Sequence, residues 1–219
     1  MSTKKTTSEV QTLEQYRVAL ENAETQPQIA STLAELGYDA TVIGEGKTIL
    51  TETCKAYNLN KTEDDETNQS YAIFTDLKQE IEKTYSLHRK KAKVIYRNDQ
   101  ITLEKLGIKG SAPKAYVKWL EITKKFYTVA STDTEVQNKL VRLKITSEDI
   151  QAVLAKITKL ETARADYLRE KGESQDATKI KDSAFAKIDD WMSEFYAVAK
   201  IGLEDHPQLL EALGKTIKN

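Results

Sequence analysis

Apolar residues recur along most of this chain at intervals of three and four positions, the spacing that places side chains on one face of an α-helix. The pattern is clearest in the second half, where one apolar stripe runs through each of the ranges 116–130, 136–143, 150–168 and 185–199. Eight Gly and three Pro are too few for the many turns of an all-β fold. The pattern therefore predicts an all-α protein.

The stripes occur twice along the chain. A shift of 107 positions places Leu33 on Leu140 and aligns the segment Leu103–Gly107 with Leu210–Gly214, so that the apolar class is kept. Over the long stripes the shift is 111, and the four extra positions correspond to about one helical turn. Self-similarity of this kind indicates an internal duplication.

Each copy is expected to hold a helix, a short helix, a third helix, a long fourth helix and a closing short helix. The polar runs Asn58–Gln69 and Glu170–Asp182 are expected to contain the turn between the third and fourth helices. The fold is therefore predicted to be two tandem repeats of an antiparallel four-helix bundle unit. The predicted ranges are a disordered N-terminus at 1–8, repeat 1 at 9–110 and repeat 2 at 111–219.

Composition and charge narrow the range of partners. Thirty-three basic residues against 34 acidic ones leave a net charge of −1, so no whole-chain field attracts nucleic acid or an anionic membrane. The longest nearly apolar stretch, Phe195–Leu203, contains Lys200 and is too short to span a bilayer. Cys54 is the single cysteine and no secretory segment follows Met1, which favours a cytoplasmic location.

Residues that could carry chemistry are few. His88 and His206 are the two histidines, and neither has a Glu three positions before it, as a helical metal site would require. The segment Gly44–Thr48 matches only the tail of a phosphate-binding loop, without its first glycine or preceding strand. We therefore predict no catalytic, cofactor-binding or metal-binding residue and a protein that is not an enzyme.

One stretch concentrates positive charge and is a candidate basic patch. At the end of a long helix, basic side chains interact favourably with the negative end of the helix dipole, so a solvated helix terminus explains the cluster. The alternative is a site for a small ligand or for nucleic acid phosphates. The candidate residues are His88, Arg89, Lys90, Lys91, Lys93 and Arg97.

The two copies differ most in their aromatic residues, which suggests a candidate partner face. Copy 2 carries four large aromatic side chains where the same shifts place Thr12, Ala19, Glu80 and Thr84 in copy 1. Aromatic residues are concentrated at interface hot spots. Three interpretations stay open: a partner groove, the contact between the copies, or a larger core in copy 2. The four residues are Trp119, Phe126, Trp191 and Phe195.

The last 25 residues contain two patterns, Phe195-Tyr196-x-x-Ala199-Lys200-x-x-Leu203 and Pro207-Gln208-Leu209-Leu210-Glu211-x-Leu213-Gly214. Together they resemble the C-terminus of uncharacterised bacterial helical-bundle proteins. The resemblance implies a helical bundle and a bacterial source, and it brings no activity with it.

The function that these observations favour is a non-enzymatic helical protein-protein interaction or scaffold protein, whose partner is a second copy or another protein. The alternative is small-ligand or nucleic-acid binding through residues 88–97, although the balanced charge disfavours nucleic acid.

Overall fold

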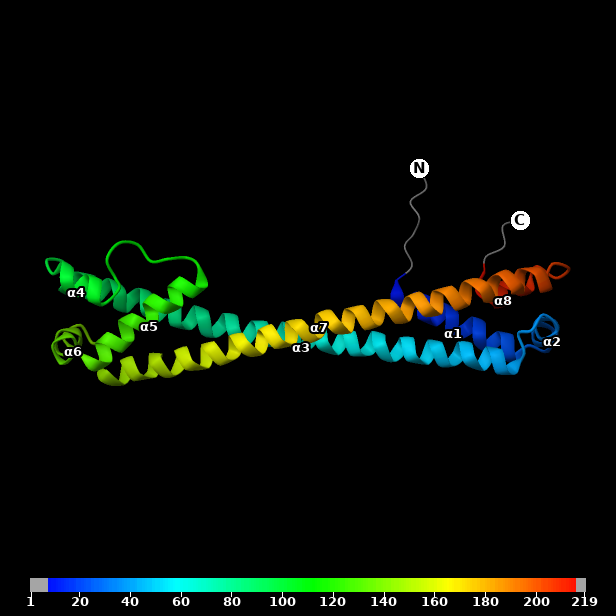
Figure 1. The fold of residues 1–219 in the computed structure, drawn as a ribbon, viewed down its shortest axis with the longest axis horizontal. Coiled ribbons are helices and arrows are strands. Elements are labelled where there is room, and N and C mark those ends of the chain that lie inside the picture. The colour runs from blue at the N-terminus through cyan, green and yellow to red at the C-terminus, as the bar shows by residue number, and fades with distance from the viewer. Residues whose placement is uncertain (1–7, 216–219) are drawn as a thin grey trace, which may run out of the picture. The chain divides into compact units, whose positions relative to one another are not determined.

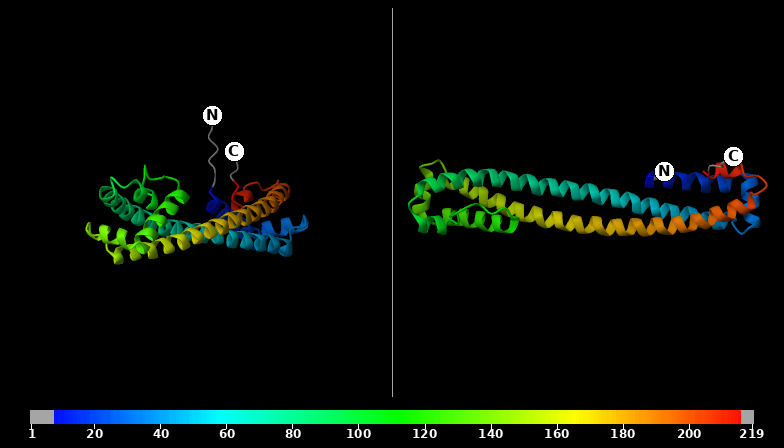
Figure 2. Two further views of the ribbon diagram at one scale, coloured as in Figure 1. Left: turned by 60° about the vertical axis from the view of Figure 1, so that its left-hand side comes forward. Right: turned by 90° about the horizontal axis from the view of Figure 1, so that it is seen from above.

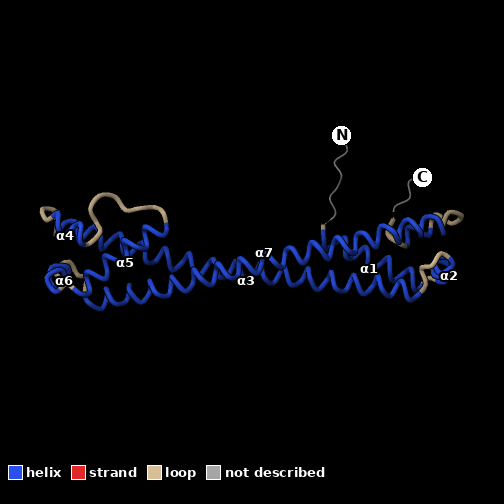
Figure 3. Tube along the Cα trace, viewed as in Figure 1, coloured by secondary structure: helices blue, strands red, loops and turns tan. Residues whose placement is uncertain are grey.

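The structure is a computed structural model, and it describes residues 8–215. Every regular element in this range is an α-helix, as predicted (Figures 1 and 3). The elements are α1 (Glu9–Thr25), α2 (Pro27–Glu35), α3 (Ala40–Ile95), α4 (Gln100–Lys105), α5 (Tyr116–Thr132), α6 (Thr134–Val141), α7 (Ser147–Gly202) and α8 (Leu209–Ala212).

The first helix begins with a capping box. The Ser8 side chain accepts a hydrogen bond from the Gln11 amide, and the Gln11 side chain accepts one from the Ser8 amide. These bonds satisfy two of the amides that a helix start leaves without partners. The predicted disordered segment 1–8 is thus wrong at Ser8, and its residues 1–7 lie outside the described residues.

Four short helices end in the same way. Each is followed by a residue with left-handed backbone, namely Gly37, Gly107, Lys144 and Gly214, with φ between 54° and 88°. The next amide in each case donates to the carbonyl five residues earlier, which is the Schellman arrangement. Gly37 and Lys144 are 107 positions apart, and so are Gly107 and Gly214.

The two long helices differ from the prediction. α3 and α7 each run for 56 residues without interruption, so the turns expected within Asn58–Gln69 and Glu170–Asp182 do not exist. Neither run contains a proline, and a single Gly172 costs a helix only about 1 kcal/mol. The polar composition of these runs marks exposed helix surface, because Glu, Asp, Gln and Lys are compatible with a helix whose face meets water.

The chain forms two compact units. Unit 1 consists of Met1–Asp65 with Gly172–Asn219, and unit 2 consists of Glu66–Lys171. These units do not coincide with the bundles predicted at 9–110 and 111–219. The reason is the continuity of the long helices: a helix that does not turn cannot fold its second half onto its first. Each half therefore packs against a half of the other long helix.

Unit 1 is built around α1, α2, the first part of α3 and the last part of α7 (Figure 2). Its helices α3 and α7 run antiparallel, since Asn60 donates to Thr178 at 3.1 Å while Gly46 lies against Trp191. Its fully buried large apolar side chains include Leu20, Ile29, Leu33, Ile43, Ile188, Met192 and Phe195.

Unit 2 contains the rest of α3, the helices α4, α5 and α6, and the first part of α7. Here too α3 and α7 are antiparallel, because Glu80 pairs with Lys156 and Tyr71 contacts Tyr167. The core is rich in aromatic residues. Its deeply buried large side chains include Ile81, Tyr85, Tyr96, Leu106, Ile108, Phe126, Tyr127, Leu140 and Ile145.

Candidate functional site

The four aromatic residues predicted as a partner face do not form an exposed surface. Phe126 and Phe195 are fully buried, Trp119 is only 3% exposed, and Trp191 is half-buried. A side chain that is already buried in its own unit offers no area to a partner. The partner-face interpretation therefore fails for Trp119, Phe126 and Phe195.

These side chains instead pack against residues from the first half of the chain. In unit 1, Trp191 stacks on Phe195, and both rings contact Tyr38 with centroids 5.8 Å away. In unit 2, Phe126 lies edge-on to Tyr85 at 5.7 Å. The contact between the copies and a larger core in copy 2 were two of the three interpretations that the sequence left open, and the burial of these residues in the two cores is compatible with both.

The predicted basic patch is divided between different faces of α3, and its last member, Arg97, lies beyond the end of that helix. His88 is buried, and its Nδ1 is hydrogen-bonded to the Tyr127 hydroxyl at 3.0 Å. Burial lowers the pKa of His88, and the charge of Lys91 lowers it further, whereas Asp149 acts in the opposite direction. A histidine held neutral inside the core adds no positive charge to the surface.

Two further members of the patch are occupied by backbone carbonyls. Arg89 donates to the carbonyls of Ile108 and Gly110, and Lys93 donates to the same Gly110 oxygen. These bonds attach the segment between α4 and α5 to α3. Lys90 and Arg97 are exposed and Lys91 is half-buried, so the six residues do not act as one surface.

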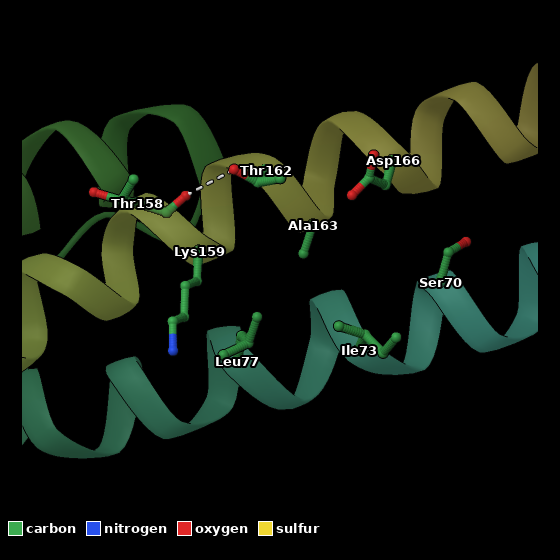
Figure 4. A pocket seen from close by; sticks show the side chains of 8 residues that line it. All are labelled: Ser70, Ile73, Leu77, Thr158, Lys159, Thr162, Ala163 and Asp166. Atoms are coloured by element: carbon green, nitrogen blue, oxygen red, sulfur yellow. Dashed lines mark hydrogen bonds between the residues drawn. The ribbon is translucent and has the colours of Figure 1, made fainter.

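The structure contains an apolar groove that the sequence did not indicate. It lies in unit 2 between α3 and α7, has a volume of about 380 Å³ and is drawn in Figure 4. Ile73 and Leu77 of α3 form its floor together with Ala163 of α7. Ile73 is 51% exposed. Ser70, Thr158, Lys159, Thr162 and Asp166 complete its lining.

The hydroxyl groups beside this groove are satisfied within their own helices. Thr162 donates to the Thr158 carbonyl and Thr158 to the Leu154 carbonyl, both at 3.3 Å, while Ser70 donates to the Thr67 carbonyl at 2.9 Å. Hydroxyls that bond back to the helix need no partner in the groove. The groove therefore presents mainly methyl and methylene surface, which is suited to packing.

The groove continues toward an acidic end. A second hollow, lined by Glu66, Gln69 and Glu170, shares Ser70 and Ile73 with the first. At this end, Arg169 pairs with Glu170 at 2.7 Å and with Asp166 at 3.0 Å. At the opposite end of the groove, the charged residue of the lining is Lys159. The groove thus has an apolar centre and charged ends of opposite sign.

Sequence reasoning missed this groove for two reasons. Ile73 lies next to Phe74 in the sequence, and the periodicity of a single helix does not show that it lines a groove with Ala163 of α7. The acidic end also falls in runs that were predicted to be turns, which would have interrupted both walls. The signal that the sequence did carry is an isoleucine outside the core stripe of a polar helix.

Among the described helices, none combines the length and apolar character needed to cross a membrane. Comparisons with protein-family models, with curated proteins and with solved structures each give no match to this chain.

Proposed function

We propose that this protein is a non-enzymatic interaction protein that binds an amphipathic helix of a partner protein in the groove between α3 and α7 of unit 2. The observation that carries the proposal is the apolar floor of Ile73, Leu77 and Ala163, bordered by hydroxyls that are already hydrogen-bonded. A helix laid into an apolar groove between two helices is a recurrent mode of peptide recognition.

The dimensions of the groove fit a short helical segment. Its α3 wall extends from Glu66 to Leu77, about three helical turns, which spans about 16 Å at 1.5 Å per residue. The small side chains of Ser70 and Ala163 allow the backbone of a third helix to approach closely. Completing the burial of Ile73, which is half-exposed, contributes about 1 kcal/mol.

The charges at the two ends define a direction for the bound helix. Glu170 is already paired with Arg169, so Glu66 is the carboxylate that favours basic side chains or the positive N-terminal end of a helix, whereas Lys159 favours acidic side chains or the C-terminal end. We therefore infer a partner helix whose N-terminus lies near Glu66 and whose apolar residues face Ile73 at intervals of three and four.

We also propose that the chain arose by duplication of one helical unit. The helix lengths of 17, 9, 56 and 6 residues are followed by lengths of 17, 8, 56 and 4. The left-handed turn residues at Gly37 and Gly107 recur 107 positions later, at Lys144 and Gly214. We further propose that the protein is bacterial, as the resemblance of its C-terminus implies, and cytoplasmic, as its single cysteine suggests.

The test is affinity capture with chemical cross-linking from the source cells, comparing the native chain with Ile73→Glu and Leu87→Glu. Both residues lie in α3 of unit 2 and are about half-exposed, at 51% and 52%, but only Ile73 lines the groove. Leu87→Glu is therefore a matched control for an added surface charge.

We expect a protein that cross-links to Lys159, that is captured by the native chain and by Leu87→Glu, and that is lost with Ile73→Glu. If the captured protein is the chain itself, sedimentation of the purified protein should show association that Ile73→Glu abolishes. Equal capture by all three proteins, with no cross-link at Lys159, would refute the groove as the binding site.

A further inference from the structure

Another cavity of unit 2, separate from the groove and from its acidic end, lies where the segment between α4 and α5 covers α3. Its volume is about 250 Å³. Three cationic side chains line it, namely Arg89 and Lys90 of α3 and Lys114 of the covering segment. Tyr85 and Trp119 line it as well, so that positive charge and aromatic surface meet in one place. The groove of Figure 4 shares no lining residue with this cavity.

Two polar atoms of the lining residues, the Tyr85 hydroxyl and Nε of Arg89, are buried. The Tyr85 side chain is 1% exposed. Arg89 opposes the rise in the Tyr85 pKa that burial causes, through its charge and through a side-chain hydrogen bond to Tyr85. These contacts fix the Arg89 side chain at the wall of the cavity, where its charge attracts an anion.

The cations of the cavity are not neutralised by the protein. Within residues 8–215, neither Arg89 nor Lys90 nor Lys114 takes part in an ion pair. The one carboxylate in the lining, Glu82, pairs with Lys78 at 3.0 Å. Three positive charges around a cavity, with their only acidic neighbour engaged elsewhere, favour an anionic ligand.

We propose that this cavity binds a small organic anion, whose carboxylate or phosphate group is held by Arg89, Lys90 and Lys114 and whose apolar part lies against Trp119. The volume corresponds to about eight water molecules at about 30 Å³ each, which limits the ligand to the size of a small metabolite. Lys90 and Lys114 are exposed, long and flexible, and they are the part of the wall that can move to admit the ligand.

The proposal assigns separate roles to residues of the predicted basic patch. Arg89 combines a structural role, in its bonds to Ile108 and Gly110, with a positive charge at the wall of the cavity. Lys90 acts only in ligand binding. His88, which is buried against Tyr127, takes no part.

The experiment uses the full chain and follows the indole N–H signals of its two tryptophans by NMR, assigned with Trp191→Phe. Phenyl phosphate and benzoate are titrated separately at constant ionic strength up to about 10 mM, enough to occupy about nine tenths of a site with a Kd of 1 mM. We expect a saturable shift of the Trp119 signal with at least one probe and none of the Trp191 signal. The probe that binds distinguishes a phosphate from a carboxylate ligand.

Two double variants test the role of the lysines. Lys90→Gln with Lys114→Gln should weaken binding at least tenfold, whereas Lys83→Gln with Lys118→Gln removes the same charge from exposed positions outside the cavity and should leave affinity unchanged. Equal weakening by both pairs would mean non-specific attraction and would overturn the proposal. Absence of saturation with both probes would overturn it as well.

Discussion

Replacing Gly46 by alanine should fail to stabilise the protein, although the same replacement at Gly44 should stabilise it. Both glycines lie near the start of α3, where alanine is the better helix former by about 1 kcal/mol. A Cβ at Gly44 would have no neighbour within 4 Å. Gly44→Ala is therefore expected to raise the free energy of unfolding by up to about 1 kcal/mol.

At Gly46 the same methyl group would meet the Trp191 ring. The nearest ring carbons would be 2.5, 2.7 and 2.8 Å from the new Cβ. The ring cannot give way easily, because it stacks on Phe195 at 5.6 Å and touches Tyr38. Overpacking of this kind costs about 1–3 kcal/mol, which cancels or exceeds the gain in helix propensity. The two alanine variants should therefore differ by about 1–3 kcal/mol.

Urea unfolding followed by circular dichroism measures this difference, and thermal melting should separate the variants by several degrees, at about 2–4 °C per kcal/mol for a chain of this size. A third protein, Gly46→Ala combined with Trp191→Leu, removes the clash. In that background, alanine at position 46 should recover its favourable contribution. If Gly46→Ala were as stabilising as Gly44→Ala, the close approach of Trp191 to α3 would be wrong.

Three further outcomes are expected. The fragment 66–171 should unfold cooperatively because it holds all of unit 2. The fragment 1–110 should be molten because it holds only part of each unit, and its cooperative unfolding would contradict the division of the chain into these two units. Because burial lowers the pKa of His88, the unfolded chain binds the proton more tightly than the folded chain does. Stability should therefore fall as the pH drops below 6.5, the ordinary pKa of a histidine side chain. His88→Gln should abolish that part of the pH dependence of urea unfolding. Burial raises the pKa of Tyr196 to about 12, so its contribution should be complete below pH 10 and lost as the pH rises toward 12. Because burial also raises the pKa of Tyr16, Tyr38 and Tyr127, Tyr196→Phe should make the alkaline limb of the same curve less steep without removing it, and an unchanged limb would exclude Tyr196.

Several local features could be predicted from the sequence because their causes are local. The apolar spacing identified the helical class and most of the buried stripe residues, such as Leu33, Leu140 and Ile188. The closing short helix expected in each copy is present, and a left-handed glycine follows it at Gly107 and at Gly214. A side chain on the apolar stripe of a helix has few alternatives to burial, so the periodicity alone is informative.

The candidate sites were less accessible to sequence reasoning. His88 and Lys90 are close in sequence but lie on different faces of α3, one buried and one exposed. Conversely, Tyr85, Lys90 and Lys114 lie at one cavity although the last of them belongs to a different segment. Charge density along a sequence does not distinguish faces of a helix, nor does it show which loop will cover them.

The amino-acid sequence by itself determined that this protein is helical, which faces of its helices are apolar, and that each half closes with a short helix. Only the tertiary structure decided whether the polar runs around Asp64 and Ser174 are turns or helix. Residues of these types are compatible with either, and the choice depends on a partner: Ser174 donates to Asp64 at 2.6 Å, and Asn60 to Thr178, across the two long helices. Once those helices continue, each half must pack against the other helix, so the compact units, the groove and the cavity follow from contacts between residues far apart in the chain.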